Sequence, residues 1–127
     1  MWAYDQDVQP PAPFLDIVIY HPENSVQATR SRAKVDTAAD ISAIPAPWVV
    51  QLGLPIASKL TVEGYDGIPA SVFTYTVLME VGPARFKNLE VIAIPETYAL
   101  LGRDILNHFY IHLNGPELTF DLSLTPI

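Results

Sequence analysis

Cysteine is absent from this chain of 127 residues, which excludes disulfides, thiolate metal sites and a cysteine nucleophile. Basic residues are few: seven lysines and arginines stand against fourteen aspartates and glutamates, so the formal net charge is −7. A nucleic-acid partner would require a clustered basic surface, and we therefore expect no nucleic-acid binding. No apolar run approaches the length of a membrane span, and we expect no direct membrane insertion.

The hydrophobic content is nevertheless high enough for a folded core. Half of the residues are hydrophobic and only 17% are charged, which is typical of a globular protein of one domain. We expect an N-terminal arm over residues 1–13, which contains three prolines and becomes ordered only by docking, followed by one domain over residues 14–127. The N-terminus lacks the layout of a secretory signal and cysteine is absent, so we expect a cytoplasmic location.

Short β-rich segments separated by turn residues follow one another along the chain. We predict strands at residues 14–20, 26–35, 41–44, 59–65, 68–81, 85–94, 109–113 and 117–122. A brief helix is predicted at residues 47–53, between Pro47 and Gly53, and another at residues 103–108. These elements predict a mostly-β single domain, a barrel or a sandwich, with one or two short helices.

One acidic turn has the composition of a catalytic site. Asp36 follows an apolar strand and is succeeded by a hydroxyl residue, two small residues and a second acid, Asp40. This arrangement presents a carboxylate with little side-chain bulk around it. Paired carboxylates can activate water without a metal, a thiol or a cofactor, but the chain contains only one such turn. A catalytic pair would therefore come from two copies of the protein; the alternative is that Asp36 merely caps a turn.

Two segments together resemble the retroviral-type (retropepsin-like) aspartic peptidases. Val35-Asp36-Thr37-Ala38-Ala39-Asp40 is close to that family's Asp-Thr-Gly-Ala-Asp turn. Residues 99–106, Ala-Leu-Leu-Gly-Arg-Asp-Ile-Leu, are close to its element of two hydrophobic residues, Gly-Arg-Asp/Asn and a helix. A hairpin with Asp-Gly at its turn falls between them, where such enzymes carry their flap. The order and spacing agree over roughly residues 14 to 122.

The resemblance implies a retropepsin-like fold and an aspartic endopeptidase that works as a homodimer on a peptide or protein substrate, without a cofactor. Asp36 of each subunit would be catalytic, and Thr37 and Ala38 would support the pair. Thr37 would do so by a hydrogen bond across the dimer axis; the alternative is that it is only a β-favouring residue at a strand end. The flap tip would comprise Tyr65, Asp66 and Gly67 and would contact the substrate. For all three, an ordinary hairpin turn without a lid function is the alternative.

The resemblance also assigns roles to the end of the acidic turn. Ala39 and Asp40 would bind the substrate backbone, and Asp40 would form a structural ion pair with Arg103. Otherwise Asp40 is a solvated turn acid and Arg103 a charge on the surface of a helix. His108 and His112 are four residues apart, but the segment between them is predicted as a strand and no third ligand is nearby. We predict no metal site.

Ala38 departs from the family pattern, because it replaces a glycine that lies beside the catalytic acid. If the backbone there requires a positive φ, alanine costs on the order of 1 kcal/mol. The substitution favours an alternative function, a catalytically weak or inactive peptide-binding dimer of the same fold. A third interpretation is a structural β-domain of a larger assembly.

Overall fold

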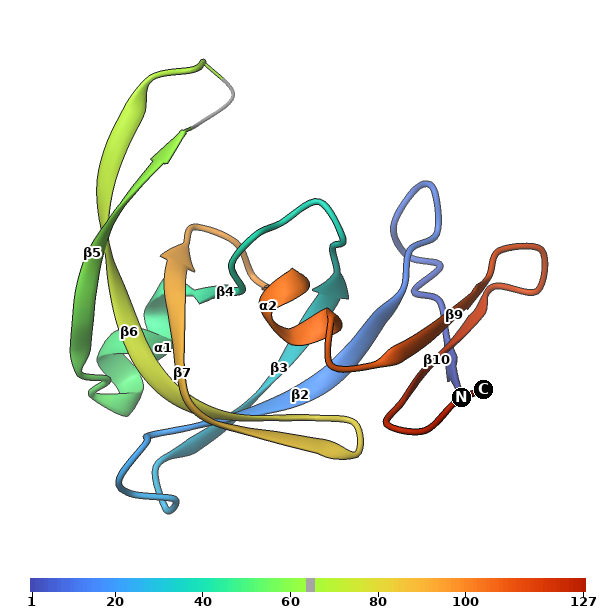
Figure 1. Ribbon diagram of the computed structural model, residues 1–127, viewed down its shortest axis with the longest axis horizontal. Coiled ribbons are helices and arrows are strands. Elements are labelled where there is room, and N and C mark those ends of the chain that lie inside the picture. The colour runs from blue at the N-terminus through green and yellow to red at the C-terminus, as the bar shows by residue number, and fades with distance from the viewer. Residues whose placement is uncertain (64–65) are drawn as a thin grey trace.

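A barrel formed by six strands of one sheet dominates the computed structural model, which describes residues 1–63 and 66–127 (Figure 1). The strand order in this sheet is β2-β3-β8-β4-β7-β6-β5, and a further pairing of β2 with β6 closes the barrel. The strands are β2 (Phe14–Tyr20), β3 (Ala28–Val35), β4 (Ala43–Pro45), β5 (Ile56–Glu63), β6 (Pro69–Val81), β7 (Ala84–Ile94) and β8 (Ala99–Leu101). The predicted mostly-β closed barrel is confirmed.

Alternation along the strands builds the core. On β2, residues Ile17 and Ile19 are buried, whereas Asp16 between the strand's apolar positions is exposed. β6 repeats the pattern near its end with Val77 and Met79, both fully buried. The largest fully buried side chains of the molecule are Phe120, Leu15, Ile17, Ile19, Ile44, Met79, Leu101, Ile105, Val77, Val81, Val91 and Thr74. Thr74 is the single polar member of this set.

Two short helices cover the barrel where the sequence predicts them. In α1 (Ala46–Leu52), Pro47 lies in the first turn, and Gly53 ends the helix at φ 61° in the left-handed region that glycine tolerates. The second helix, α2 (Arg103–Leu106), is shorter than the predicted segment and follows β8 directly. Neither helix of the described residues is long and apolar enough to cross a membrane.

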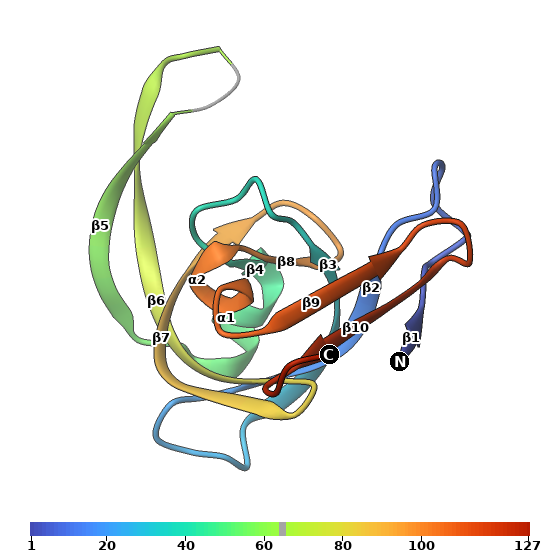
Figure 2. The ribbon, with the colours of Figure 1, turned by 45° about the vertical axis from the view of Figure 1, so that its right-hand side comes forward.

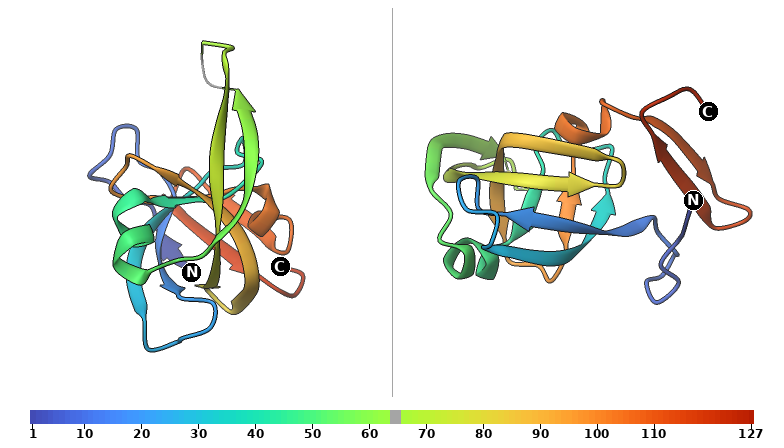
Figure 3. Two further views of the ribbon diagram at one scale, coloured as in Figure 1. Left: turned by 90° about the vertical axis from the view of Figure 1, so that its left-hand side faces the viewer. Right: turned by 90° about the horizontal axis from the view of Figure 1, so that it is seen from below.

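The two ends of the chain meet in a second, three-stranded sheet beside the barrel (Figure 3). Its order is β1 (Trp2–Ala3), β10 (Thr119–Ser123) and β9 (Tyr110–Asn114). The ring of Trp2 stacks on that of Phe120 at a centroid distance of 5.5 Å. The N-terminal segment therefore docks on the C-terminal hairpin of its own chain. Neither β1 nor β8 was predicted, because strands of two or three residues are too short to show an alternating pattern.

The hairpin of β5 and β6 extends away from the barrel (Figures 1 and 2). Its strands pair in antiparallel register from Ser58↔Thr74 to Glu63↔Pro69. At the tip, Asp66 Oδ1 accepts a hydrogen bond of 3.0 Å from the Ile68 N–H, and Gly67 has φ 71°. Of the three predicted tip residues, Tyr65 lies outside the described residues.

Candidate active site

Asp36 is placed by the pairing of β3 with β8. The two strands run parallel with Val35 opposite Leu101, and the Asp36 N–H donates a 3.0 Å hydrogen bond to the Leu101 carbonyl. The chain then turns, since the Ala39 N–H reaches the Asp36 carbonyl at 3.2 Å. Asp36 Oδ1 accepts a 3.1 Å hydrogen bond from the Ala38 N–H. A half-buried carboxylate is thus fixed at the end of a barrel strand, in a local turn of its own making.

Ala38 lies in this turn without left-handed strain. Asn88 and Leu118 are the non-glycine residues with positive φ among those described, and Ala38 is not one of them. The cost foreseen for alanine under a positive φ therefore does not arise. Thr37 and Ala38 are both exposed, so their side chains face away from the core.

Arg103 at the start of α2 joins the two motifs. Its backbone N–H donates to the Ala39 carbonyl at 2.9 Å, and Nη1 donates to the Thr37 carbonyl at 2.8 Å. Nη2 forms an ion pair with Asp40 Oδ1. The structure therefore brings together the two residues that the sequence pairs, and the same guanidinium also holds the backbone of the acidic turn.

Position 102 requires glycine because there is no room for a side chain, not because the backbone has a positive φ. A Cβ atom built on it would lie 2.9 Å from the Ala39 carbonyl oxygen and 2.9 Å from the Ile41 carbonyl carbon. Such distances to backbone atoms are shorter than real Cβ contacts allow. The absence of a side chain lets β8 and α2 approach the acidic loop closely.

Ser42 and Asp104 form a part-buried connection that sequence reasoning missed. Ser42 Oγ donates to Asp104 Oδ1 at 2.7 Å, and the Ser42 N–H donates to Oδ2 at 3.0 Å. The same hydroxyl oxygen accepts the Gly102 N–H at 2.9 Å, and the Ser42 residue is fully buried. The sequence shows Asp104 directly after Gly102-Arg103 as part of a motif, but the motif does not indicate which residue binds its carboxylate.

A cleft of about 560 Å³ lies between the acidic loop and the hairpin of β5 and β6, which is named the flap hairpin for its predicted role. Aliphatic side chains from four elements predominate in its lining, which comprises Ala39, Asp40, Ile41, Ala43, Leu60, Thr61, Val62, Glu63, Ile92, Ile94 and Leu100. Such a concave apolar surface with a few polar groups is typical of a ligand site. Two predicted substrate-binding residues, Ala39 and Asp40, lie in it, whereas Asp66 and Gly67 do not.

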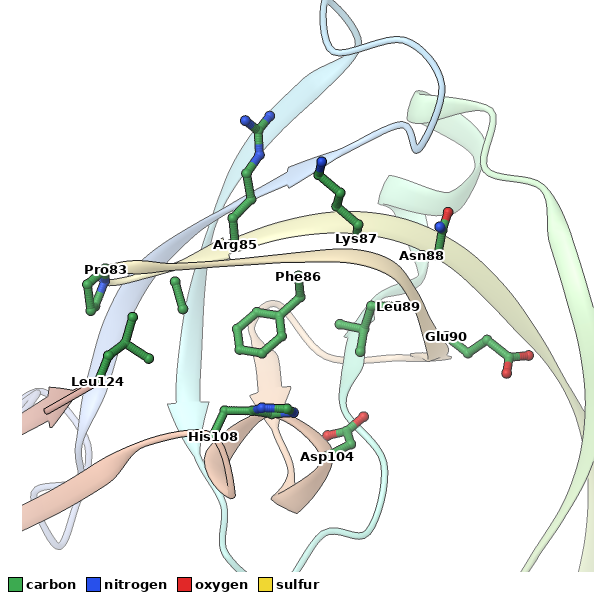
Figure 4. Close-up of a pocket in the computed structure, with 11 residues that line it drawn as sticks. Pro83, Arg85, Phe86, Lys87, Asn88, Leu89, Glu90, Asp104, His108 and Leu124 are labelled. Atoms are coloured by element: carbon green, nitrogen blue, oxygen red, sulfur yellow. The ribbon is translucent and has the colours of Figure 1, made fainter.

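A second cavity, of about 620 Å³, lies between β7 and α2 (Figure 4). Phe86 and His108 face each other inside it at a ring distance of 5.3 Å, while Arg85 and Lys87 point away. No residue of the turn 36–40 lines this cavity. Two residues of that turn, Ala39 and Asp40, line the first cleft instead, whereas Asp36, Thr37 and Ala38 do not line either one.

Comparison with known proteins settles the family. Residues 24–105 match the family described as aspartyl protease. The chain belongs to this family. No curated protein matches the sequence of this aspartyl protease. The matched segment contains the acidic turn, the flap hairpin and the Gly102-Arg103-Asp104 element.

Solved structures show the same fold. The simian foamy virus (mac) protease is 19% identical with TM-score 0.56, over 75% of this chain and 92% of that one. EIAV protease in complex with the inhibitor HBY-793 is 21% identical with TM-score 0.56, over 76% of this chain and 86% of that one. A retropepsin-like aspartic protease from Rickettsia conorii is 18% identical with TM-score 0.57, over 88% of this chain and 81% of that one. The predicted retropepsin-like relationship and the assignment as an aspartic endopeptidase are confirmed.

Proposed function

We propose that this aspartyl protease hydrolyses peptide bonds as a homodimer, with Asp36 of each subunit forming one catalytic pair. The observation that carries the proposal is the single acidic turn of each chain, which Arg103 and Gly102 fix beside the cleft. One turn supplies one carboxylate, and water activation by a carboxylate pair requires two. Thr37 and Ala38 would support the pair from the exposed surface of the turn.

The chemistry follows from two acids at close range. Both cannot ionise cheaply, so the pair shares one proton and titrates as a unit. The ionised carboxylate removes a proton from a water molecule, whose oxygen forms a bond to the scissile carbonyl carbon. The neutral carboxylic acid donates a hydrogen bond to the carbonyl oxygen. Proton transfer to the peptide nitrogen then lets the C–N bond break, and the products are a free acid and a free amine.

The cleft supports an extended peptide as the substrate. A peptide lying between the acidic loop and the flap hairpin can form strand-like hydrogen bonds with backbone on both sides. Ala39 and Asp40 line one wall, and Leu60 and Val62 line the other. The aliphatic lining favours apolar side chains in the peptide. The tip residues Asp66 and Gly67 would close over it.

The outer edge of β9 is the surface that best suits the second subunit. Within the described residues β9 pairs with β10 alone, so its other edge offers free backbone donors and acceptors, which readily pair with another strand. Tyr110 and Leu113 on this strand are 51% and 46% exposed. β9 contains no acidic residue, so joining two copies there brings no carboxylates of the strand together, despite the net charge of −7.

The proposal is tested with the Asp36→Asn variant. Wild type and variant are incubated with a mixed peptide library at several pH values, and their oligomeric state is measured by sedimentation. We expect cleavage by the wild-type dimer and none by the variant, which keeps its fold and its dimerisation. Full activity of Asp36→Asn would refute the mechanism. Retention of peptides by the wild type without cleavage would support the alternative, an inactive peptide-binding dimer.

A further inference from the structure

Three polar side chains form a compact cluster at the base of the flap hairpin. Ser58 on β5 and Thr74 on β6 have hydroxyl oxygens 2.8 Å apart. Both lie within hydrogen-bonding distance of Glu90 Oε1 on β7, at 2.8 Å from Ser58 and 2.9 Å from Thr74. The Ser58 N–H also donates to Thr74 Oγ1 at 3.0 Å. One cluster thus joins three neighbouring strands.

The two hydroxyl groups carry two protons for three contacts, and the Glu90 carboxylate can only accept. When each hydroxyl donates its one proton to the Glu90 carboxylate, Thr74 Oγ1 remains available to accept the Ser58 N–H. Hydrogen bonds from Ser58 and then Thr74 hold the pKa of Glu90 below its ordinary value. The ionised carboxylate is therefore the form that fits the cluster.

The cluster lies at the boundary between barrel and lid. Thr74, opposite Ile92, is the residue of β6 nearest the hairpin tip that pairs with β7. Between Thr74 and the tip, residues 69–73 of β6 pair with β5 alone. On β5 the register shifts between Ile56 and Ser58, directly before the cluster. Two-stranded ribbons are marginally stable on their own, so their orientation depends on how the base is held.

The same face of the hairpin reaches the cleft. Residues two apart along a strand point to one side, so Leu60 and Val62 share a face with Ser58. Both line the cleft above the acidic loop. A change in how the base of β5 is held therefore moves the wall against which a substrate packs.

We propose that Ser58, Thr74 and Glu90 are positioning residues that set the angle of the flap hairpin over the cleft, and so control affinity for the peptide. The inference rests on the proposed function, because the hairpin acts as a lid only if a peptide binds beneath it. None of the three residues belongs to the acidic turn or lines the cleft. Their loss should therefore weaken substrate binding and leave the chemical step intact.

The decisive variant is Thr74→Val, which keeps the shape of the side chain and removes its hydroxyl. We expect KM to rise about tenfold, the effect of losing one hydrogen bond to a charged group, while kcat changes less than about twofold. Thr74→Ser should restore KM. The matched control is Thr76→Val, because Thr76 lies on the same strand opposite Glu90 and has no side-chain hydrogen bond among the described residues.

A second measurement keeps the inference independent of activity. Hydrogen exchange of β5 should be faster in Thr74→Val and in Glu90→Gln than in Thr76→Val. The Glu90 side chain is exposed, so its replacement leaves the core unchanged. Equal exchange and equal KM in Thr74→Val and Thr76→Val, or failure of Thr74→Ser to restore KM, would overturn the proposal. A wild type that cleaves nothing would instead defeat the proposed function, and exchange would still decide the role of the cluster.

Discussion

Replacing Gly102 by alanine tests whether close contact between α2 and the acidic loop positions Asp36, the proposed catalytic acid. The added methyl would lie 2.9 Å from two backbone atoms, one of Ala39 and one of Ile41. Backbone atoms cannot rotate away as the end of a flexible side chain can. The φ of Gly102 is −85°, so the substitution brings no left-handed strain and its whole effect comes from space.

The size of the effect follows from this overlap. Relieving two such contacts requires the loop and α2 to separate by a few tenths of an ångström, and overpacking of this kind costs about 1–3 kcal/mol. For a domain of this length that corresponds to a fall in Tm of about 4–12 °C. The displaced residues, Ala39 and Ile41, belong to the same loop as Asp36. We expect kcat to fall on the order of tenfold, because catalysis is sensitive to sub-ångström misplacement.

The control is Gly115→Ala, since a Cβ atom on Gly115 would meet nothing within 4 Å. Both variants are compared with wild type by thermal unfolding at one protein concentration, because the proposed dimerisation would make Tm depend on concentration. Peptide cleavage is measured in parallel. If Gly102→Ala keeps the Tm and kcat of Gly115→Ala, the close contact does not position the site and the reasoning is wrong.

Three further outcomes are expected. Leu113→Glu should convert the dimer to monomer in sedimentation and abolish cleavage, whereas Val26→Glu, at an exposed site with the same added charge, should do neither. Cleavage should be fastest below neutral pH and decline as the paired acids become doubly ionised; a plateau into alkaline pH would contradict the shared proton. The pKa of Glu90 is lowered in the folded protein, so the ionised carboxylate contributes to folding stability. This contribution is complete above the ordinary pKa of 4.5 and is lost as the pH falls through the lower pKa of the folded state. Protection of β5 against hydrogen exchange should fall accordingly. Glu90→Gln should remove this dependence, although Asp104 and His108, which line the same cavity, stay unchanged in the variant.

Local patterns in the sequence were sufficient for most of the fold. A run of β-branched and aromatic residues predicted β2 over its observed bounds, and Pro47 and Gly53 marked the two ends of α1, because these signals act within a few residues. β1 and β8 were missed because their positions depend on distant partners: β1 pairs with β10, and β8 lies between β3 and β4. Such short strands exist only through tertiary contact.

The same distinction separates the parts of the site. The acid turn and the Gly-Arg-Asp element were visible as contiguous motifs, and the pairing of Asp40 with Arg103 came from their resemblance to a family. The partner of Asp104 was not predictable, because Ser42 lies 62 residues away and resembles any other serine in the sequence. The cluster at the base of the flap was hidden for the same reason.

Burial decides which of these contacts holds the catalytic turn. The ion pair of Arg103 with Asp40 is the more conspicuous, but its side chains are 44% and 85% exposed, and exposed pairs contribute about 0–1 kcal/mol. Ser42 is fully buried and its hydroxyl group bonds to both Asp104 and the Gly102 N–H. Removing one member of a buried set leaves partners unsatisfied, at a cost of about 1–3 kcal/mol for each group. The buried serine therefore anchors α2 to the acidic loop, and the exposed pair chiefly orients Asp40 toward the cleft.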